Sequence, residues 1–171
     1  DAKSGVSGAG RGLKEANLFS EAAEGLHAYS VGAHRHAPEI EQELSLAAGK
    51  LVVVNFTPHL VPMVRGELVT VHARLADGAT LGDVRAALVA RYADEPFVKV
   101  APQGASPDTR WARGSNLAVL AAFADRIPGR VILIGVIDNL VKGSGGQAVQ
   151  NLNVAMGWDE TLGLALEPMF P

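Results

Sequence analysis

The chain has 171 residues, of which 48% are apolar and 19% charged, and its formal net charge is -3. This composition is typical of a globular protein, and it excludes a disordered chain and a strongly basic nucleic-acid-binding protein. The length suits one domain that spans residues 1–171. With no cysteine in the sequence, disulfides, thiolate metal sites and a cysteine nucleophile on this chain are excluded.

The first twelve residues, "DAKSGVSGAGRG", contain four glycines and two serines without apolar periodicity, so they are predicted to form a loop. The backbone amides of such a loop can approach a phosphate closely, although the same composition is common in linkers. The first residue is Asp1 rather than Met, and the segment is already rich in turn residues. We therefore expect the sequence to begin inside a longer polypeptide.

A helix is predicted from Pro38 to Gly49. Proline suits the first helical position, acidic residues near it favour the helix dipole, and glycine commonly ends a helix. The apolar run "LVVVNFT" at 51–57 predicts a buried strand that is interrupted at Pro58. Residues 67–76 alternate between apolar and polar side chains and predict a second strand. Its apolar face is expected to consist of Val69, Val71, Ala73 and Leu75.

The middle of the chain predicts a helix followed by a strand. Thr80 with Asp83 three residues later resembles a capping box, and the helix that it opens is expected to end before Pro96. The strand "FVKV" at 97–100 follows. The next apolar segment, 115–125, is rich in alanine and suits a helix or a strand equally well.

The C-terminal third predicts a buried strand at 130–138 and then a glycine-rich turn that opens a helix. On that helix, Ala148, Leu152 and Ala155 or Met156 are expected to face inward. The elements do not alternate regularly between strand and helix. The sequence therefore predicts an α+β fold, with a mixed, largely antiparallel sheet and helices packed on one face.

The segment "HRH", at His34, Arg35 and His36, lies at or just before the N-terminus of the predicted 38–49 helix, and its spacing permits three roles. Two histidines with Glu39 nearby could bind a metal, but no other histidine shows a diagnostic spacing. The imidazoles could instead cap the helix or bond to the backbone. They could also transfer protons, because histidine titrates near neutrality and a helix N-terminus lowers its pKa. The spacing alone does not distinguish between these three roles.

Two basic residues at turns are candidates for anion binding. Arg65 follows a proline-broken strand and could bind a carboxylate or phosphate, or could be a solvated surface residue. Lys142 precedes a glycine-rich helix start and could help to bind an anion there. A plain helix-entry turn explains Lys142 equally well.

Five motifs, in order along the chain, resemble the N-acetyl-γ-glutamyl-phosphate reductase family of arginine biosynthesis. They are "DAKSGVSGAGR", "HRHAPEIEQ", "FTPHLVPMVRG", "RGSN" and "DNLVKGSGGQAVQNLNVAMGWDETLGL". Together they extend from one end of the chain to the other. The resemblance is to the C-terminal, glyceraldehyde-3-phosphate dehydrogenase-like domain of that family, which holds the substrate and makes the subunit interface.

The resemblance implies an NADPH-dependent reduction of an acyl phosphate, N-acetyl-glutamyl phosphate, to a semialdehyde through a cysteine thioester. His34 would be the catalytic histidine, which activates the thiol and gives the proton as the hemithioacetal forms and collapses. Such a step needs a group that titrates near neutral pH. The other implied site residues are Ser7, Gly8 and Asn139 for the cofactor and Tyr29, Arg65 and Arg11 for the substrate. No metal site is implied.

The family's nucleotide-binding half and nucleophilic cysteine are not part of this sequence. We therefore expect NADPH to be bound mainly by that missing half, and this chain to be inactive alone. A homodimer or homotetramer is expected through this domain. Related dehydrogenases of the lysine or aspartate pathways, or a non-catalytic assembly module, remain alternatives.

The location is expected to be cytoplasmic, with neither a membrane nor a nucleic acid as partner. No apolar run reaches the roughly 18 to 20 residues that span a bilayer. The N-terminus also lacks the pattern of a signal peptide.

Overall fold

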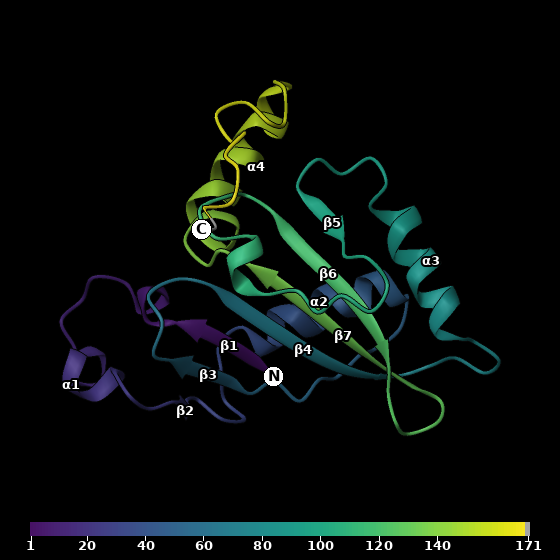
Figure 1. Cartoon of the computed structure of the whole chain (residues 1–171), viewed down its shortest axis with the longest axis horizontal. Coiled ribbons are helices and arrows are strands. Elements are labelled where there is room, and N and C mark those ends of the chain that lie inside the picture. Colours follow the sequence, from purple (N-terminus) through teal and green to yellow (C-terminus); the bar gives the residue numbers. More distant parts are fainter. Residues whose placement is uncertain (170–171) are drawn as a thin grey trace.

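A seven-stranded mixed sheet organises the computed structural model, which describes residues 1–169 (Figure 1). The strand order is β2-β3-β1-β4-β7-β6-β5. The β1–β3 and β5–β6 pairs are parallel and the remaining pairs are antiparallel. The predicted α+β fold with a mixed, largely antiparallel sheet is therefore confirmed. The strands are β1 Ala2–Gly5, β2 His27–Ala28, β3 Pro58–Val61, β4 Glu67–Arg74, β5 Val98–Val100, β6 Ala118–Ala124 and β7 Arg130–Ile137.

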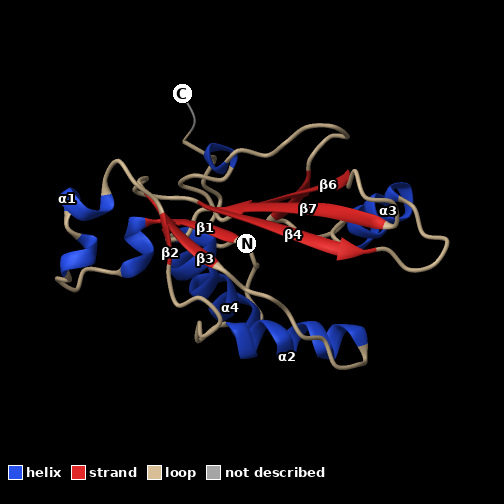
Figure 2. Ribbon diagram, turned by 90° about the horizontal axis from the view of Figure 1, so that it is seen from below, coloured by secondary structure: helices blue, strands red, loops and turns tan. Residues whose placement is uncertain are grey.

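Helices and short helical turns connect the strands. The α-helices are α1 Phe19–Ala22, α2 Ala37–Ala48, α3 Leu81–Arg91 and α4 Gly146–Met156. The shorter turns are η1 Val6–Ala9, η2 Glu15–Asn17, η3 Thr109–Trp111 and the π-helical η4 Val141–Gly145. In Figure 2, α2 and α4 lie below the strands, on the same side of the sheet. None of the helices in residues 1–169 is long and apolar enough to cross a membrane.

The core lies where the long central strands meet. Val119, Ala121 and Val136, on β6 and β7, are buried against Ala101, which follows β5. Leu68 of β4 packs against this cluster. The strand predicted at 67–76 is confirmed as β4. Leu68, on the face opposite to the expected apolar one, packs against the core cluster. On the expected face, Val69, Ala73 and Leu75 are half-buried and Val71 is 44% exposed.

The N-terminal segment was expected to be a loop, and this prediction is wrong for its first half. Residues 2–5 form β1, which lies between β3 and β4 in the sheet. The turn that follows sits directly on the chain before β4. A Cβ on Gly5 would lie 2.9 Å from the carbonyl oxygens of Met63 and Val64, so only glycine permits this approach. Pairing with β3 and β4 makes this segment a strand, which its local composition does not predict.

The buried strand predicted at 51–57 is also wrong. Residues 51–57 do not form a strand, and Leu51 is 84% exposed. The segment meets the sheet at its last residue, where the Thr57 carbonyl accepts the N–H of Ala2 over 3.1 Å. Its backbone N–H groups bond to α2 instead: Val52 donates to Ser45 Oγ and Val54 donates to a carboxylate oxygen of Glu41. The strand in this region, β3, begins only at Pro58.

The remaining elements follow the sequence closely. Helix α3 starts with the predicted capping box, in which Thr80 and Asp83 bond reciprocally. Strands β5 and β7 lie where they were predicted. The ambiguous 115–125 segment forms strand β6, because β7 and β5 supply partners along both of its edges.

The orientation of α4 corrects a further expectation. Its buried residues are Gly146, Gln150 and Asn153, whereas Leu152 and Met156 are 52% and 56% exposed. Hydrogen bonds from Gln150 and Asn153 to groups inside the fold hold this face of the helix inward. The helix therefore turns toward the domain a different face from the one that its apolar residues predicted.

Candidate functional site

His34 lies in a small aromatic cluster between β2 and α2. Its ring makes edge-on contacts with Tyr29, His36 and Phe56, at centroid distances of 5.5, 4.8 and 5.3 Å. The short connection from Tyr29 passes through Ser30, whose φ of 46° is in the left-handed region. This conformation is strained for a residue other than glycine, so the loop is held in place by its surroundings.

The protonation of His34 follows from its contacts. The backbone N–H of His36 donates to His34 Nδ1 over 3.2 Å. Nδ1 therefore carries no proton, and in the neutral ring the proton lies on Nε2. Burial lowers the pKa of His34 below its usual value, and the neighbouring charges of His36 and Arg35 add to that effect. The ring is thus held in its neutral form near pH 7, with one N–H available as a donor.

The three roles left open for the "HRH" segment are now easier to compare. His36 is the N-cap residue of α2, but its side chain makes no capping hydrogen bond. His34 is the histidine that bonds to the backbone, through its contact with the N–H of His36. Within residues 1–169, no group of three or more histidine, aspartate and glutamate side chains is placed to hold a metal ion.

Glu67, at the start of β4, is a charged neighbour that the sequence patterns did not single out. Burial raises the pKa of Glu67, and the charge of His36 partly opposes the shift. Burial also raises the pKa of Tyr29, and the charge of Glu67 adds to this, so the Tyr29 hydroxyl stays protonated and can donate. Tyr29 therefore borders His34 with a hydroxyl donor, and Glu67 is a half-buried carboxyl group near Tyr29 and His36.

Ser7, Gly8 and Asn139 lie together near Gly66, the residue before β4. Asn139 is 6% exposed, and its amide nitrogen donates to Ser7 Oγ over 2.9 Å. Its amide oxygen accepts the backbone N–H of Gly66 over 2.7 Å. A Cβ on Gly8 would lie 3.1 Å from Ser4 Oγ and 3.6 Å from Asn139 Nδ2, so the backbone at Gly8 packs closely against these two side chains. The structure brings together all three residues assigned to the cofactor.

Arg65 is held by a buried carboxylate. Its guanidinium lies 2.9 Å from Asp138, whose side chain is fully buried, while the Arg65 side chain is 24% exposed. Asp138 also accepts backbone N–H bonds from Gly114, Leu140 and Val141. Burial alone would raise the pKa of Asp138, but these N–H groups and the charge of Arg65 outweigh it, so the pKa lies below its usual value. Arg65 is therefore a fixed, partly exposed cation.

Asp138 was missed in the sequence, although one signal was present. It is the first polar residue after the apolar run that forms β7. A carboxylate at the end of a buried strand needs partners, and it finds them in the turn that follows.

Three consecutive residues connect these groups. Arg65 pairs with Asp138, Gly66 bonds to Asn139, and Glu67 is the charged neighbour of Tyr29. The predicted site residues therefore gather around the start of β4. Arg11 is the exception.

Arg11 is exposed and lines a hollow of about 490 Å³ together with Ser7 and Met63. No hydrogen bond, ion pair or ring contact within residues 1–169 joins Arg11 to Tyr29, His34 or Arg65.

Lys142 has structural partners. Its ammonium donates to Gln150 Oε1 over 2.6 Å and lies 5.6 Å from the centre of the Phe97 ring. Burial lowers its pKa, and the charges of Glu160 and Glu95 oppose that shift. The structural role is therefore the better description of Lys142, ahead of an anion site.

Several known proteins are similar to this chain in sequence. It is 58% identical over 171 residues to an N-acetyl-gamma-glutamyl-phosphate reductase of Rhodospirillum rubrum, and the match covers 100% of this chain and 49% of the relative. It is 57% identical over 171 residues to a probable chloroplastic N-acetyl-gamma-glutamyl-phosphate reductase of Arabidopsis thaliana, with 100% and 43% covered. The chain thus spans about half the length of these relatives. The resemblance that the sequence motifs indicated is confirmed.

Solved structures share the fold at low sequence identity. Aspartate semialdehyde dehydrogenase II from Vibrio cholerae matches with a TM-score of 0.66 at 18% identity, covering 90% of this chain and 54% of that one. A probable aspartate-semialdehyde dehydrogenase from Pseudomonas aeruginosa matches with a TM-score of 0.67 at 20% identity and the same coverage. The family model described as "Semialdehyde dehydrogenase, dimerisation domain" matches residues 1–139. The chain belongs to the semialdehyde dehydrogenase dimerisation domain family.

Proposed function

We propose that this chain is the substrate-binding and subunit-assembling half of an NADPH-dependent N-acetyl-γ-glutamyl-phosphate reductase. The observation that carries the proposal is the 58% identity to such a reductase along the whole chain. The cluster around His34 adds chemical support, because it presents a neutral imidazole beside a hydroxyl donor. The reaction converts an acyl phosphate to a semialdehyde.

His34 is the proton-transfer residue of this proposal. Nδ1 of His34 already accepts the N–H of His36, so the available donor is Nε2–H. We expect Nε2–H to donate to the oxygen of the reacting carbonyl as negative charge develops there. If the same nitrogen acts as the base toward a thiol, the proton must first move to Nδ1. That shift would break the bond from His36, so the observed geometry favours the donor step.

Arg65 is the substrate anchor with the best geometric support. Its pairing with Asp138 fixes the guanidinium, and the remaining exposure leaves N–H groups for a carboxylate or phosphate oxygen. Tyr29 has a protonated hydroxyl next to His34 and suits a second contact to the substrate. Arg11 is a weaker candidate because no hydrogen bond, ion pair or ring contact within the described residues joins it to Tyr29, His34 or Arg65.

The residues assigned to the cofactor fit a contact with the nicotinamide. The backbone of Gly8 lies close to Asn139, and the Asn139 amide has a second N–H beyond the one that it donates to Ser7. NADPH, when bound, supplies the hydride. Ser7 and Asn139 hold this surface in place, and most of the contact with the nucleotide is assigned to the half of the full-length protein outside this chain.

The partners follow from the same assignment. N-acetyl-glutamyl phosphate is the proposed substrate. The family model's description as a dimerisation domain supports a homodimer or homotetramer through this part of the protein. A cytoplasmic location is proposed for a bacterial form, whereas the plant relatives carry "chloroplastic" in their names.

The full-length reductase that contains this chain tests the proposal. We expect NADPH oxidation that depends on N-acetyl-glutamyl phosphate, and no such oxidation by the 171-residue chain alone, which has no cysteine. Replacing His34 by alanine should lower kcat by roughly 10²- to 10⁴-fold, as for the loss of a general acid or base. Full activity of that variant, or turnover by the chain alone, would refute the proposal.

A further inference from the structure

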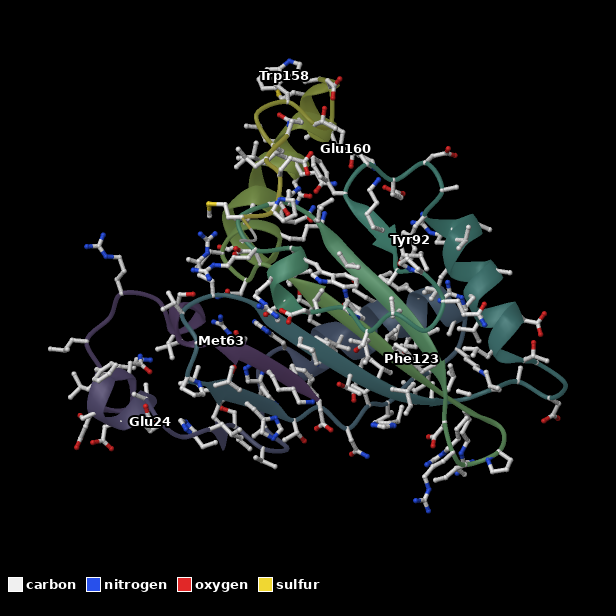
Figure 3. The ribbon with its side chains drawn as sticks, viewed as in Figure 1. Glu24, Met63, Tyr92, Phe123, Trp158 and Glu160 are labelled. Carbon is white, nitrogen blue, oxygen red and sulfur yellow. The ribbon has the colours of Figure 1, made fainter. Side chains whose placement is uncertain are left out.

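The hollow that Arg11 lines has walls from two stretches of the chain, the N-terminal segment through α1 and the residues that follow β3. The backbone joins these stretches, because the N–H groups of Val6 and Ser7 donate to the carbonyls of Met63 and Val64. Figure 3 shows Met63 on the side of the sheet from which the α1 segment projects. The hollow is therefore bordered by segments that are hydrogen-bonded to each other.

Most of the side chains that line the hollow are apolar. Among them, Leu13 and Phe19 are 91% and 88% exposed, so much of the apolar lining is open to water. A volume of about 490 Å³ lies in the range of small-molecule sites, in which apolar walls hold the ligand and a few polar groups orient it. The apolar walls suit a ligand that has an apolar portion.

Three polar side chains of the same lining, those of Arg11, Lys14 and Asn17, carry donors without acceptors. Within residues 1–169, neither the Arg11 nor the Lys14 side chain makes a hydrogen bond or an ion pair. Asn17 Nδ2 is buried and also has no hydrogen-bond partner among the described residues. A buried N–H without an acceptor is costly, so this position favours a ligand that supplies one.

The charge of the lining is positive. Glu15, Glu21 and Glu24 belong to the same segment, but none of them lines the hollow. The two cationic side chains therefore face the hollow without an opposing carboxylate, and they favour an anionic ligand.

We propose that this hollow binds a small carboxylate that carries a short apolar chain. The carboxylate accepts the unpaired N–H of Asn17 and pairs with Arg11 and Lys14, and the chain covers part of the apolar lining, including Leu13 and Phe19. This assignment takes Arg11 out of the set of substrate anchors and goes beyond the proposed function.

Ser7 connects the hollow to the surface assigned to NADPH, because it lines the hollow and its hydroxyl accepts a bond from Asn139. A phosphate group of NADPH carries the same kind of charge as a free carboxylate. The apolar lining favours the carboxylate with its chain, and competition with NADPH separates the two sources.

A titration of the full-length protein with sodium hexanoate tests the proposal. The methionine methyl groups are labelled with carbon-13, and Met63→Leu identifies the NMR signal of the methionine in the hollow. Met156, which lies on α4 and does not line the hollow, is the internal reference. We expect hexanoate to shift the Met63 signal to saturation, with a Kd on the order of 1 mM, and to leave the Met156 signal in place. Acetate lacks the chain and 1-hexanol lacks the charge, so each should bind at least about tenfold more weakly.

Two substitutions test the polar contacts. Asn17→Leu removes the unpaired N–H, and the Asn17 side chain makes no hydrogen bond within residues 1–169, so the urea midpoint should be retained while hexanoate binding weakens about tenfold. Arg11→Gln should weaken it about threefold or more. Arg126→Gln is the matched control, because Arg126 is also exposed but does not line the hollow, and it should leave the affinity unchanged.

Three results would overturn the inference. The first is a Met63 signal that hexanoate does not shift, or that 1-hexanol shifts equally well. The second is an unchanged affinity in either Asn17→Leu or Arg11→Gln. The third is loss of the hexanoate response in saturating NADPH or N-acetyl-glutamate, which would assign the hollow to the cofactor or the substrate. The titration needs no turnover, so an inactive protein that binds hexanoate counts against the proposed function alone, and an active protein that does not bind it counts against this inference alone.

Discussion

The ion pair between Arg65 and Asp138 allows a prediction whose magnitude can be worked from the contacts. In Asp138→Asn, one carboxylate oxygen becomes an amide group that can only donate. In the native chain, one oxygen accepts from Leu140, Val141 and, at 3.4 Å, Arg65 Nε, and the other accepts from Gly114 and pairs with Arg65 at 2.9 Å. Whichever way the new amide is turned, at least two donors would face it across a buried contact.

The expected cost follows from those two lost bonds. A buried donor left without a partner costs about 1 to 3 kcal/mol. The lost attraction to Arg65 adds less than a fully buried pair would, because the Arg65 side chain is 24% exposed and water screens it. We therefore expect Asp138→Asn to lower the free energy of unfolding by roughly 3 kcal/mol at pH 7.

Urea unfolding of the chain, followed by the fluorescence of Trp111 and Trp158, measures this change. Glu95→Gln is the control, since Glu95 pairs with Arg91 on the surface at 3.0 Å and its loss should cost about 0.5 kcal/mol or less. A loss below about 1 kcal/mol for Asp138→Asn would refute the reasoning.

The pH dependence provides an independent check on the same pair. The pKa of Asp138 in the folded chain lies below its usual value, so its contribution to stability is fully present above the unfolded pKa of about 3.9. That contribution disappears as the pH falls through the lower, folded pKa. The difference between the native chain and Asp138→Asn should therefore shrink only below about pH 4. A difference that shrinks between pH 5 and 8 would contradict this assignment.

Further substitutions test the close approaches and the histidine pair. Gly146→Ala should destabilise the chain by about 1 to 3 kcal/mol in urea unfolding, because its Cβ collides with a buried asparagine side chain, whereas Gly145→Ala, with only an ordinary 3.6 Å contact, should be nearly neutral. Gly66→Ala should cost about 2 kcal/mol or more, since its φ is 113° and a Cβ would lie 2.9 Å from a threonine side chain; a loss below 1 kcal/mol would contradict this. In the full-length reductase, the acidic limb of the pH–kcat profile should lie below the usual histidine range and should disappear in His34→Ala. His36→Ala should retain activity and move that limb to higher pH, because the His36 charge lowers the pKa of His34; an unmoved limb would contradict the assignment.

Structural features whose sequence signals lie within a few residues of each other were predicted correctly. The Thr80 capping box, the Gly49 end of α2 and the strand at 130–138 all form as expected, because their signals depend on neighbours within a few residues. The candidate site residues were named from family motifs, and most of them gather around the start of β4.

Elements that depend on distant partners were predicted poorly. The glycine-rich start became β1 because β3 and β4 flank it. Within the apolar 51–57 run, Val52 and Val54 bond to side chains of α2, and the segment reaches β1 at its last residue, Thr57. Periodicity placed the apolar residues of α4 on one face, yet it could not reveal that Gln150 and Asn153 would find polar partners inside the fold. Asp138 was missed for the same reason, since its importance depends on Arg65 far away in the sequence.

The sequence by itself determined the fold class, the family resemblance and the position of His34 just before a helix. Those features follow from the spacing of side chains along a short stretch and from motifs in fixed order. Only the tertiary structure decided which nitrogen of His34 carries the proton, what holds Arg65 in place and which face of α4 is open. The pairing of Arg65 and the rotation of α4 depend on hydrogen bonds and burial between segments that meet only in the folded chain, where removal from water makes an unpaired polar group costly. The proton position on His34 depends on a local turn that brings its ring to the N–H of His36, two residues later.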